Sequence, residues 1–232
     1  MQRLDKVLSE AGVASRRELK GIIRAGRVTV NGQAVRTPEQ KVDAAADTIL
    51  VDGQPIARPG VVVLMLHKPA GYVTSTEDPR DPTVMELLPE PYRSMELSPV
   101  GRLDKETEGL LLLTNDGALL HRLISPKHRV PKIYEAEHDG ESTAADVEAF
   151  QQGIVLRDGD VCLPAELTPL EPGKSLIVLH EGKYHQVRRM MASRGLYVRY
   201  LKRVAEGPLE LGDLSKGACR VLEQEEILQL QA

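Results

Sequence analysis

The chain of 232 residues contains no tryptophan, one phenylalanine, six tyrosines and only two cysteines. Two isolated thiols, Cys162 and Cys219, do not make a disulfide-rich secreted domain, and they fit small core residues better than a metal site. No apolar run approaches the roughly 18 residues of a membrane span, and the amphipathic start is unlike a secretory signal. We therefore expect a globular cytoplasmic protein with no membrane partner.

Motifs for bound metals and cofactors are also missing. The six histidines form no closely spaced pair and have no cysteine near them. Neither of the usual glycine-rich phosphate-binding loops is present, and no serine lies in a nucleophile elbow. The sequence therefore predicts no metal and no cofactor.

Charge is distributed unevenly along the chain. The whole sequence has 30 Lys and Arg against 34 Asp and Glu, a net charge of −4. Residues 1–36 hold eight basic and three acidic residues, a net charge of +5, so the remaining 196 residues carry −9. All seven aromatic residues lie beyond residue 70. Charge and composition therefore separate a small basic unit from a larger acidic one.

The boundary between these units is indicated by the segment 54–60, which is rich in Pro and Gly and precedes an apolar run at 61–66. That run predicts a buried strand. We expect a first domain at residues 1–57, a linker at 58–60 and a second domain at 61–232.

The first unit has the pattern of two short helices followed by hairpins. Ser15 followed by Glu18 predicts a capping box at the start of the second helix. Asn31-Gly32 predicts a tight hairpin turn that needs positive φ at both residues, and Asp52-Gly53 resembles it. The cations left for the solvent side of the second helix and its end are Arg16, Arg17, Lys20, Arg24 and Arg27.

A run of charge taken alone is more often a solvated helix surface than a binding site. In an otherwise acidic chain, cations concentrated on one small unit fit a phosphate-binding surface better. The two helices with Ser15-Arg16-Arg17, followed by residues 26–32, resemble the small αL-type RNA-binding module first described in a small-subunit ribosomal protein. The resemblance covers roughly residues 2–50 and implies structured RNA bound through shape and backbone.

Two segments of the second unit place reactive side chains beside predicted strands. Asp104 lies in a loop that leads into the apolar strand 110–113, and a helix is predicted at 118–124. A loop aspartate alone is more often a turn residue than a catalyst. In a later strand, alternation places Lys132 and Tyr134 on one face, where the tyrosine could stack on a base.

A third segment predicts a helix that starts near Tyr184 and buries Val187, Met190 and Met191. Arg188 lies in line with Tyr184 and Met191 on such a helix, so it is the more inward arginine. An inward guanidinium needs a carboxylate partner. Spacing alone favours an ordinary structural acid as that partner.

In order and spacing, the three segments resemble the motifs of the pseudouridine synthases. The match is most specific at Gly101-Arg102-Leu103-Asp104 and at 107–117, which resemble the signature loop of that family. The resemblance implies that Asp104 is the nucleophile, that Tyr134 packs against the target base and that Arg188 is the basic partner of the aspartate. Arg102 and Lys132 would form, beside Arg188, a basic surface along which the RNA binds.

The sequence of residues 67–76 and 125–128 looks most like the RsuA branch, which acts on small-subunit rRNA. Relatives that act on large-subunit rRNA share the signature loop, so large-subunit (23S) rRNA is the alternative to small-subunit (16S) rRNA. The resemblance implies an α+β fold, with a helix-helix-hairpin module followed by a larger, mainly antiparallel mixed sheet with flanking helices. It further implies a monomer that isomerises a uridine of rRNA, free or in a partly assembled ribosomal subunit.

Two other classes of function stay open. A non-catalytic RNA-binding factor of ribosome assembly could keep the fold, although Asp104, Tyr134 and Arg188 are all present. A hydrolase could use Asp104 with Glu106 or Glu108 as paired carboxylates, but no second segment supplies a base that would activate water.

Overall fold

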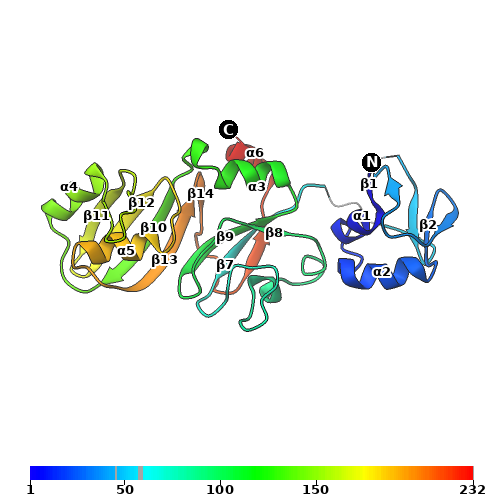
Figure 1. The fold of residues 1–232 in the computed structure, drawn as a ribbon, viewed down its shortest axis with the longest axis horizontal. Coiled ribbons are helices and arrows are strands. Elements are labelled where there is room, and N and C mark those ends of the chain that lie inside the picture. Colours follow the sequence, from blue (N-terminus) through cyan, green and yellow to red (C-terminus); the bar gives the residue numbers. More distant parts are fainter. Residues whose placement is uncertain (45, 57–59, 232) are drawn as a thin grey trace.

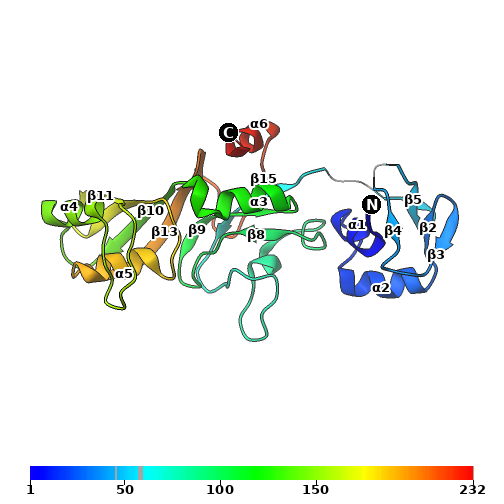
Figure 2. The ribbon, with the colours of Figure 1, turned by 45° about the horizontal axis from the view of Figure 1, so that its top comes forward.

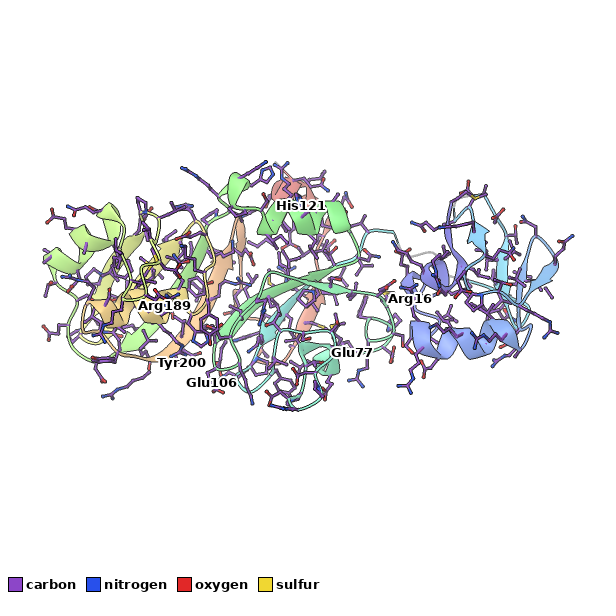
Figure 3. All side chains as sticks on the ribbon, in the orientation of Figure 1. Arg16, Glu77, Glu106, His121, Arg189 and Tyr200 are labelled. Carbon is purple, nitrogen blue, oxygen red and sulfur yellow. The ribbon has the colours of Figure 1, made fainter. Side chains whose placement is uncertain are left out.

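The computed structural model describes residues 1–44, 46–56 and 60–231. A small N-terminal part lies at one end of the molecule and a larger part extends away from it (Figure 1). They meet where Arg16 Nη1 lies 3.3 Å from Glu96 Oε1, and Figure 3 shows Arg16 facing this junction. The expected two-part α+β fold is confirmed. Of the predicted linker at 58–60, only residue 60 lies within the described residues, so the domain boundary stays a prediction.

The N-terminal module packs two helices against a small sheet. Its elements are α1 (Leu4–Glu10), α2 (Arg16–Arg24), β1 (Gln2–Arg3), β2 (Val28–Val30), β3 (Gln33–Val35), β4 (Lys41–Val42), β5 (Ile49–Val51) and β6 (Gln54–Pro55). Strands β3, β2, β5 and β6 form one antiparallel sheet, and β1 pairs with β4. Leu8 of α1, Leu19 of α2 and Val28 of β2 are fully buried in one core.

Two local predictions for this module are confirmed. Ser15 and Glu18 form the capping box, since the Glu18 amide donates to Ser15 Oγ at 3.4 Å and the Ser15 amide donates to Glu18 Oε2 at 3.1 Å. Asn31 and Gly32 have φ values of 51° and 81°, as the tight turn between β2 and β3 requires. The capping box fixes where α2 begins and therefore which way its cations face.

In the part of the chain that the structure describes, the larger domain has a nine-stranded sheet of order β11-β12-β10-β13-β9-β7-β15, with β14 beside β13 and β8 beside β9. The strands are β7 (Val63–Lys68), β8 (Ser98–Val100), β9 (Glu108–Thr114), β10 (Lys132–His138), β11 (Glu166–Glu171), β12 (Lys174–Leu179), β13 (Val198–Glu206), β14 (Leu209–Glu210) and β15 (Cys219–Val221). All of these strand pairs are antiparallel except β13 with β9, so the mixed, mainly antiparallel sheet is confirmed.

Four α-helices among the described residues flank this sheet. They are α3 (Gly117–Ile124), α4 (Ala144–Gln152), α5 (Gln186–Ser193) and α6 (Gln224–Gln231), with short 3₁₀ turns η1 (Val84–Leu87) and η2 (Pro126–His128). Figure 2 shows α4 and α5 at the end of the sheet far from the N-terminal module, and α6 above α3 near its middle. No described helix is long and apolar enough to cross a membrane.

Strand β9 is buried on both faces, as its run of four leucines predicts. Leu111 and Leu113 belong to the core cluster that also holds Met190 of α5. Leu110 and Leu112 belong to a second cluster on the other face, together with side chains of α3 and α6. A strand packed on both faces is a rigid support for the loop that precedes it, and that loop carries Asp104.

The two halves of the sheet meet at a short parallel seam between β9 and β13. Lys202 lies opposite Glu108 and Arg203 opposite Gly109. Gly109 has a φ of 111°, and a Cβ added to it would lie 2.1 Å from the Arg203 carbonyl oxygen. Only glycine allows this approach of two backbones. The glycine therefore lets the loop before β9 lie against the other half of the sheet.

The two cysteines are small core residues, as expected. Cys162 is buried in the core cluster that holds Met190, and Cys219 packs against the same cluster. Burial raises the pKa of both thiols, so neither has the thiolate character of a reactive cysteine.

Candidate active site

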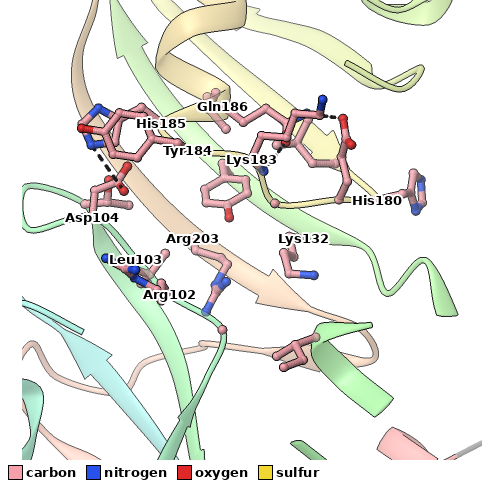
Figure 4. Close-up of a pocket in the computed structure, with 18 of the residues that line it drawn as sticks. Arg102, Leu103, Asp104, Lys132, His180, Lys183, Tyr184, His185, Gln186 and Arg203 are labelled. Carbon is pink, nitrogen blue, oxygen red and sulfur yellow. Dashed lines mark hydrogen bonds and ion pairs between the residues drawn. The ribbon is translucent and has the colours of Figure 1, made fainter. Parts of the chain in front are cut away.

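A cavity of about 400 Å³ opens at the seam between β9 and β13 (Figure 4). Its walls come from the loop 101–104 before β9, from β10 and β13, and from the segment 179–187 that leads into α5. A cavity of this size suits a single small ligand, such as one nucleotide base. The seam therefore brings together segments that lie far apart in the sequence.

Asp104 presents its carboxylate to this cavity from the loop between β8 and β9 (Figure 4). Its Oδ1 lies 3.5 Å from His185 Nε2, and the Asp104 side chain is 34% exposed. Its carbonyl oxygen accepts a hydrogen bond from the Thr107 amide at 3.0 Å, which closes a turn in the loop. The loop thus holds an accessible carboxylate on the cavity wall.

Lys68, at the end of β7, fixes the backbone of this loop. Its side chain is fully buried, and Nζ donates to the carbonyl oxygens of Asp104 and Lys105 at 3.1 Å and of Thr107 at 2.8 Å. It also donates to the Pro69 carbonyl at 3.1 Å. Burial lowers the pKa of Lys68 to about 8. The signal for this role in the sequence is a lysine that ends an apolar strand, because such a lysine must find polar partners inside the fold.

Tyr134 and Lys132 face the cavity from one side of β10, as the strand alternation predicts. Tyr134 is only 8% exposed, and burial raises the pKa of its hydroxyl. Lys132 Nζ donates to the Val130 carbonyl at 3.2 Å and lies 3.8 Å from Glu206 Oε1. The Lys132 side chain is only 14% exposed, so it is a cavity residue more than a surface cation, and burial lowers its pKa.

Arg203 is a cavity residue that the sequence reasoning missed. Its side chain is 1% exposed, and Nε donates to the Leu110 carbonyl at 2.7 Å. Its Nη2 lies 3.1 Å from Glu206 Oε2, in a pair of fully buried charges. The missed signal is an arginine in phase with Leu201 and Ala205, the buried positions of β13.

The expected pair between Arg188 and Asp104 is not formed in the described residues, and this prediction is corrected. Arg188 Nη1 donates to the Val198 carbonyl at 3.0 Å, and Arg188 does not line the cavity. The helix begins at Gln186, two residues after Tyr184, and His185 before it has a left-handed conformation. His185, and not Arg188, lies beside the Asp104 carboxylate. A role of Arg188 in the reaction stays a prediction.

Two family models match this chain. Residues 62–193 match the model described as RNA pseudouridylate synthase, and residues 2–49 match the S4 domain model. The chain belongs to the RNA pseudouridylate synthase family. The S4 match agrees with the RNA-binding module expected at the N-terminus.

Relatives match this pseudouridine synthase over nearly its whole length. The Bacillus subtilis (strain 168) protein named "Uncharacterized RNA pseudouridine synthase YtzG" is 40% identical over 230 residues, covering 97% of this chain and 96% of the relative. The Escherichia coli (strain K12) protein named "Ribosomal small subunit pseudouridine synthase A" is 40% identical over 228 residues, covering 97% and 98%. A solved structure described as "Crystal structure of pseudouridylate synthase" aligns with a TM-score of 0.70 at 33% identity, covering 99% and 100%. The resemblance to RsuA-type pseudouridine synthases is confirmed.

In this pseudouridine synthase, three of the expected RNA-binding cations are exposed along α2. They are Arg17, Lys20 and Arg24. Their spacing of three and four residues places them on one side of the helix. Their contact with RNA stays a prediction, as does that of Arg102, which is exposed beside the cavity.

The other two expected cations of the module have acidic partners. Arg16 Nη2 lies 3.2 Å from Asp5 Oδ2, and its Nη1 reaches Glu96 of the catalytic domain. Arg27 Nη2 lies 2.5 Å from Asp52 Oδ2. The ion pair of Arg16 with Glu96 therefore connects the module to the catalytic domain of the enzyme. Both Arg16 and Arg27 are less available to RNA because acidic side chains already bind them.

Proposed function

We propose that this pseudouridine synthase isomerises a specific uridine of small-subunit rRNA, with Asp104 as the nucleophile. The observation that carries the proposal is an accessible Asp104 carboxylate on the wall of a base-sized cavity that Tyr134 also lines. The choice of small-subunit rRNA is supported by relatives from Vibrio parahaemolyticus and Escherichia coli. Each is 40% identical over 97% of this chain and is named for that subunit.

The reaction rearranges bonds within one nucleotide. The N-glycosidic bond breaks, the uracil turns, and a carbon–carbon bond forms through its carbon 5, so no atom is gained or lost. The step requires a carboxylate that attacks either the anomeric carbon or the uracil ring. It also requires that water be kept from the intermediate. Asp104 supplies the carboxylate, and the buried side chains of Tyr134 and Arg203 form the closed inner wall.

Binding energy from two places would offset the cost of removing the uridine from its stack, which is a few kcal/mol. Tyr134 would contact the uracil and replace part of the lost stacking. The exposed cations of α2 would bind the RNA backbone at a place distant from the cavity. Such remote contacts would help to position the reacting nucleotide.

The proposal is tested by mapping pseudouridines in transcripts of the source organism's small- and large-subunit rRNA after incubation with the purified enzyme. We expect one modified uridine in the small-subunit transcript and none with Asp104→Asn. Glu106→Gln is the matched control, because Glu106 is an exposed carboxylate of the same loop and should be dispensable. Comparison of rRNA from cells with and without the gene tests the same assignment in vivo.

Each part of the proposal fails on a different result. Wild-type turnover by Asp104→Asn would remove the nucleophile assignment. If only the large-subunit transcript were modified, the substrate would be large-subunit rRNA and the small-subunit assignment would be wrong. RNA that is bound but never modified by the wild-type protein, in transcripts or in cells, would favour a non-catalytic assembly factor.

A further inference from the structure

Two aromatic side chains lie face to face at the rim of the cavity. The rings of Tyr184 and His185 are parallel to within 15°, and their centroids are 3.9 Å apart. His185 is the inner ring, since its Nε2 lies 3.5 Å from Asp104 Oδ1, whereas Tyr184 is 74% exposed. Figure 4 shows both rings beside Asp104. The stack therefore extends from the carboxylate out to solvent.

The backbone that carries the two rings is held in place. His185 has a φ of 46°, which a residue with a Cβ adopts only where its surroundings require it. The Tyr184 carbonyl accepts a hydrogen bond from Arg189 Nη1 at 3.1 Å, and the Lys183 amide donates to Gln186 Oε1 at 2.9 Å. The rings are thus presented by a fixed turn at the start of α5.

An exposed aromatic ring is unusual in this chain. All seven aromatic residues lie in the described part, and only Tyr184 and Tyr197 among them are exposed. Tyr197 does not line the catalytic cavity, whereas Tyr184 does. The outer face of Tyr184 is apolar surface that the fold itself does not bury, at the place where substrate must enter.

We infer that Tyr184, backed by His185, is a stacking platform for the nucleotide next to the uridine that is isomerised. The inference rests on the proposed function. When the uridine leaves its stack, the flanking base loses a partner and exposes one face. An open tyrosine ring accepts the face of any base. Tyr134, inside the cavity, takes the target base, so the two tyrosines contact neighbouring nucleotides.

This arrangement also specifies the class of substrate. A flanking base can lie on Tyr184 only if it is free of its own helix, so the modified uridine belongs to a loop, a bulge or a strand end. Inside a continuous duplex the flanking base would stay paired, so it could not turn onto the platform even where the departing uridine uncovers its face.

The test uses short RNAs that contain the mapped uridine, with fluorescent 2-aminopurine at its 5′ neighbour in one and its 3′ neighbour in the other. Full-length wild type, Tyr184→Ala, Tyr184→Phe and Tyr197→Ala are compared. We expect binding by wild type to quench one of the two probes, and Tyr184→Ala to lose that quenching. Loss of one stacked base should raise KM roughly 10-fold, with kcat nearly unchanged. Tyr184→Phe keeps the ring and Tyr197→Ala removes an exposed ring elsewhere, so both should behave as wild type.

Each contrary result has one meaning. If Tyr184→Ala matches Tyr197→Ala in quenching and KM, the platform is refuted while the isomerase activity of the wild type stands. A lower kcat with unchanged KM and quenching also refutes it, because Tyr184 would then act on Asp104 through His185. A wild-type enzyme that forms no pseudouridine refutes the proposed function, and the platform with it, in a separate measurement.

Discussion

Replacement of Gly109 by alanine tests whether the seam between β9 and β13 sets the geometry of the active site. The new Cβ would stand 2.1 Å from the carbonyl oxygen of Arg203 and 2.6 Å from its amide nitrogen. Both atoms belong to a paired strand, so neither can turn aside as a flexible side chain could. The φ of 111° at Gly109 adds strain, because residues with a Cβ rarely adopt it.

The size of the effect follows from the same distances. Ordinary contacts of a Cβ begin near 3.4 Å, so the two strands must part by roughly 1 Å to admit the methyl group. Overpacking of this kind costs about 1–3 kcal/mol, and the strained backbone adds about 1–2 kcal/mol. Asp104 precedes one strand and Arg203 lies on the other. Their separation would change, and a misplacement of about 1 Å can lower a catalysed rate about 100-fold.

The matched control is Gly195→Ala in the same domain. Gly195 has a φ of 78°, but nothing lies within 4 Å of its added Cβ, so this variant has the strain without the collision. Urea unfolding and pseudouridine formation are measured for both variants. We expect Gly109→Ala to lose roughly 2–5 kcal/mol and most activity, and Gly195→Ala to lose at most about 2 kcal/mol and keep its activity. If the two variants were equally stable and equally active, the contact between Gly109 and Arg203 would not set the geometry of the site.

Two further predictions concern cations. Lys68→Met removes the donor of four carbonyl groups and should lower stability. Burial lowers the pKa of Lys68 from 10.5 to about 8, so between these pH values the unfolded chain binds more protons than the folded chain. The wild type should therefore gain stability relative to the variant as the pH rises from about 8 to 10.5. Urea unfolding at pH 7 and pH 10 measures the difference in unfolding free energy between wild type and variant. A difference that does not change with pH would count against the lowered pKa. Combined Lys20→Glu and Arg24→Glu should weaken RNA binding and reduce the slope of log affinity against log salt by about 2, without changing the unfolding midpoint. If filter binding across salt concentrations gave the same slope for the variant and the wild type, α2 would not be a site of RNA contact.

The sequence predicted those elements whose signals are local. Ser15 and Glu18 cap α2 through contacts within one turn, and Asn31-Gly32 satisfies the turn through its own backbone preferences. The four leucines of β9 are buried on both faces because no other environment suits such a run. Each of these predictions depended on residues within a few positions of one another.

The site was predicted less completely because its geometry depends on contacts between distant segments. Asp104 and Tyr134 line one cavity, but Arg188 does not, and a left-handed turn at His185 precedes α5. That turn is held by hydrogen bonds around it, which helical periodicity does not register. Arg203 reaches the cavity only because Gly109 allows β13 and β9 to pair in parallel. No spacing rule within either strand contains that information.

The charge asymmetry of the sequence has a narrower physical meaning in the structure. Arg16 and Arg27 are held by acidic partners, one of which belongs to the catalytic domain. Arg17, Lys20 and Arg24 have no ion pair among the described residues, and their spacing gathers them into one stripe on α2. Of the eight cations in the first 36 residues, Arg36 and these three have no ion pair among the described residues, and the three on α2 form a line that suits a single stretch of RNA backbone. Arg16 lies on the same helix and forms an ion pair with Glu96, so the surface that we propose for RNA is connected to the catalytic domain.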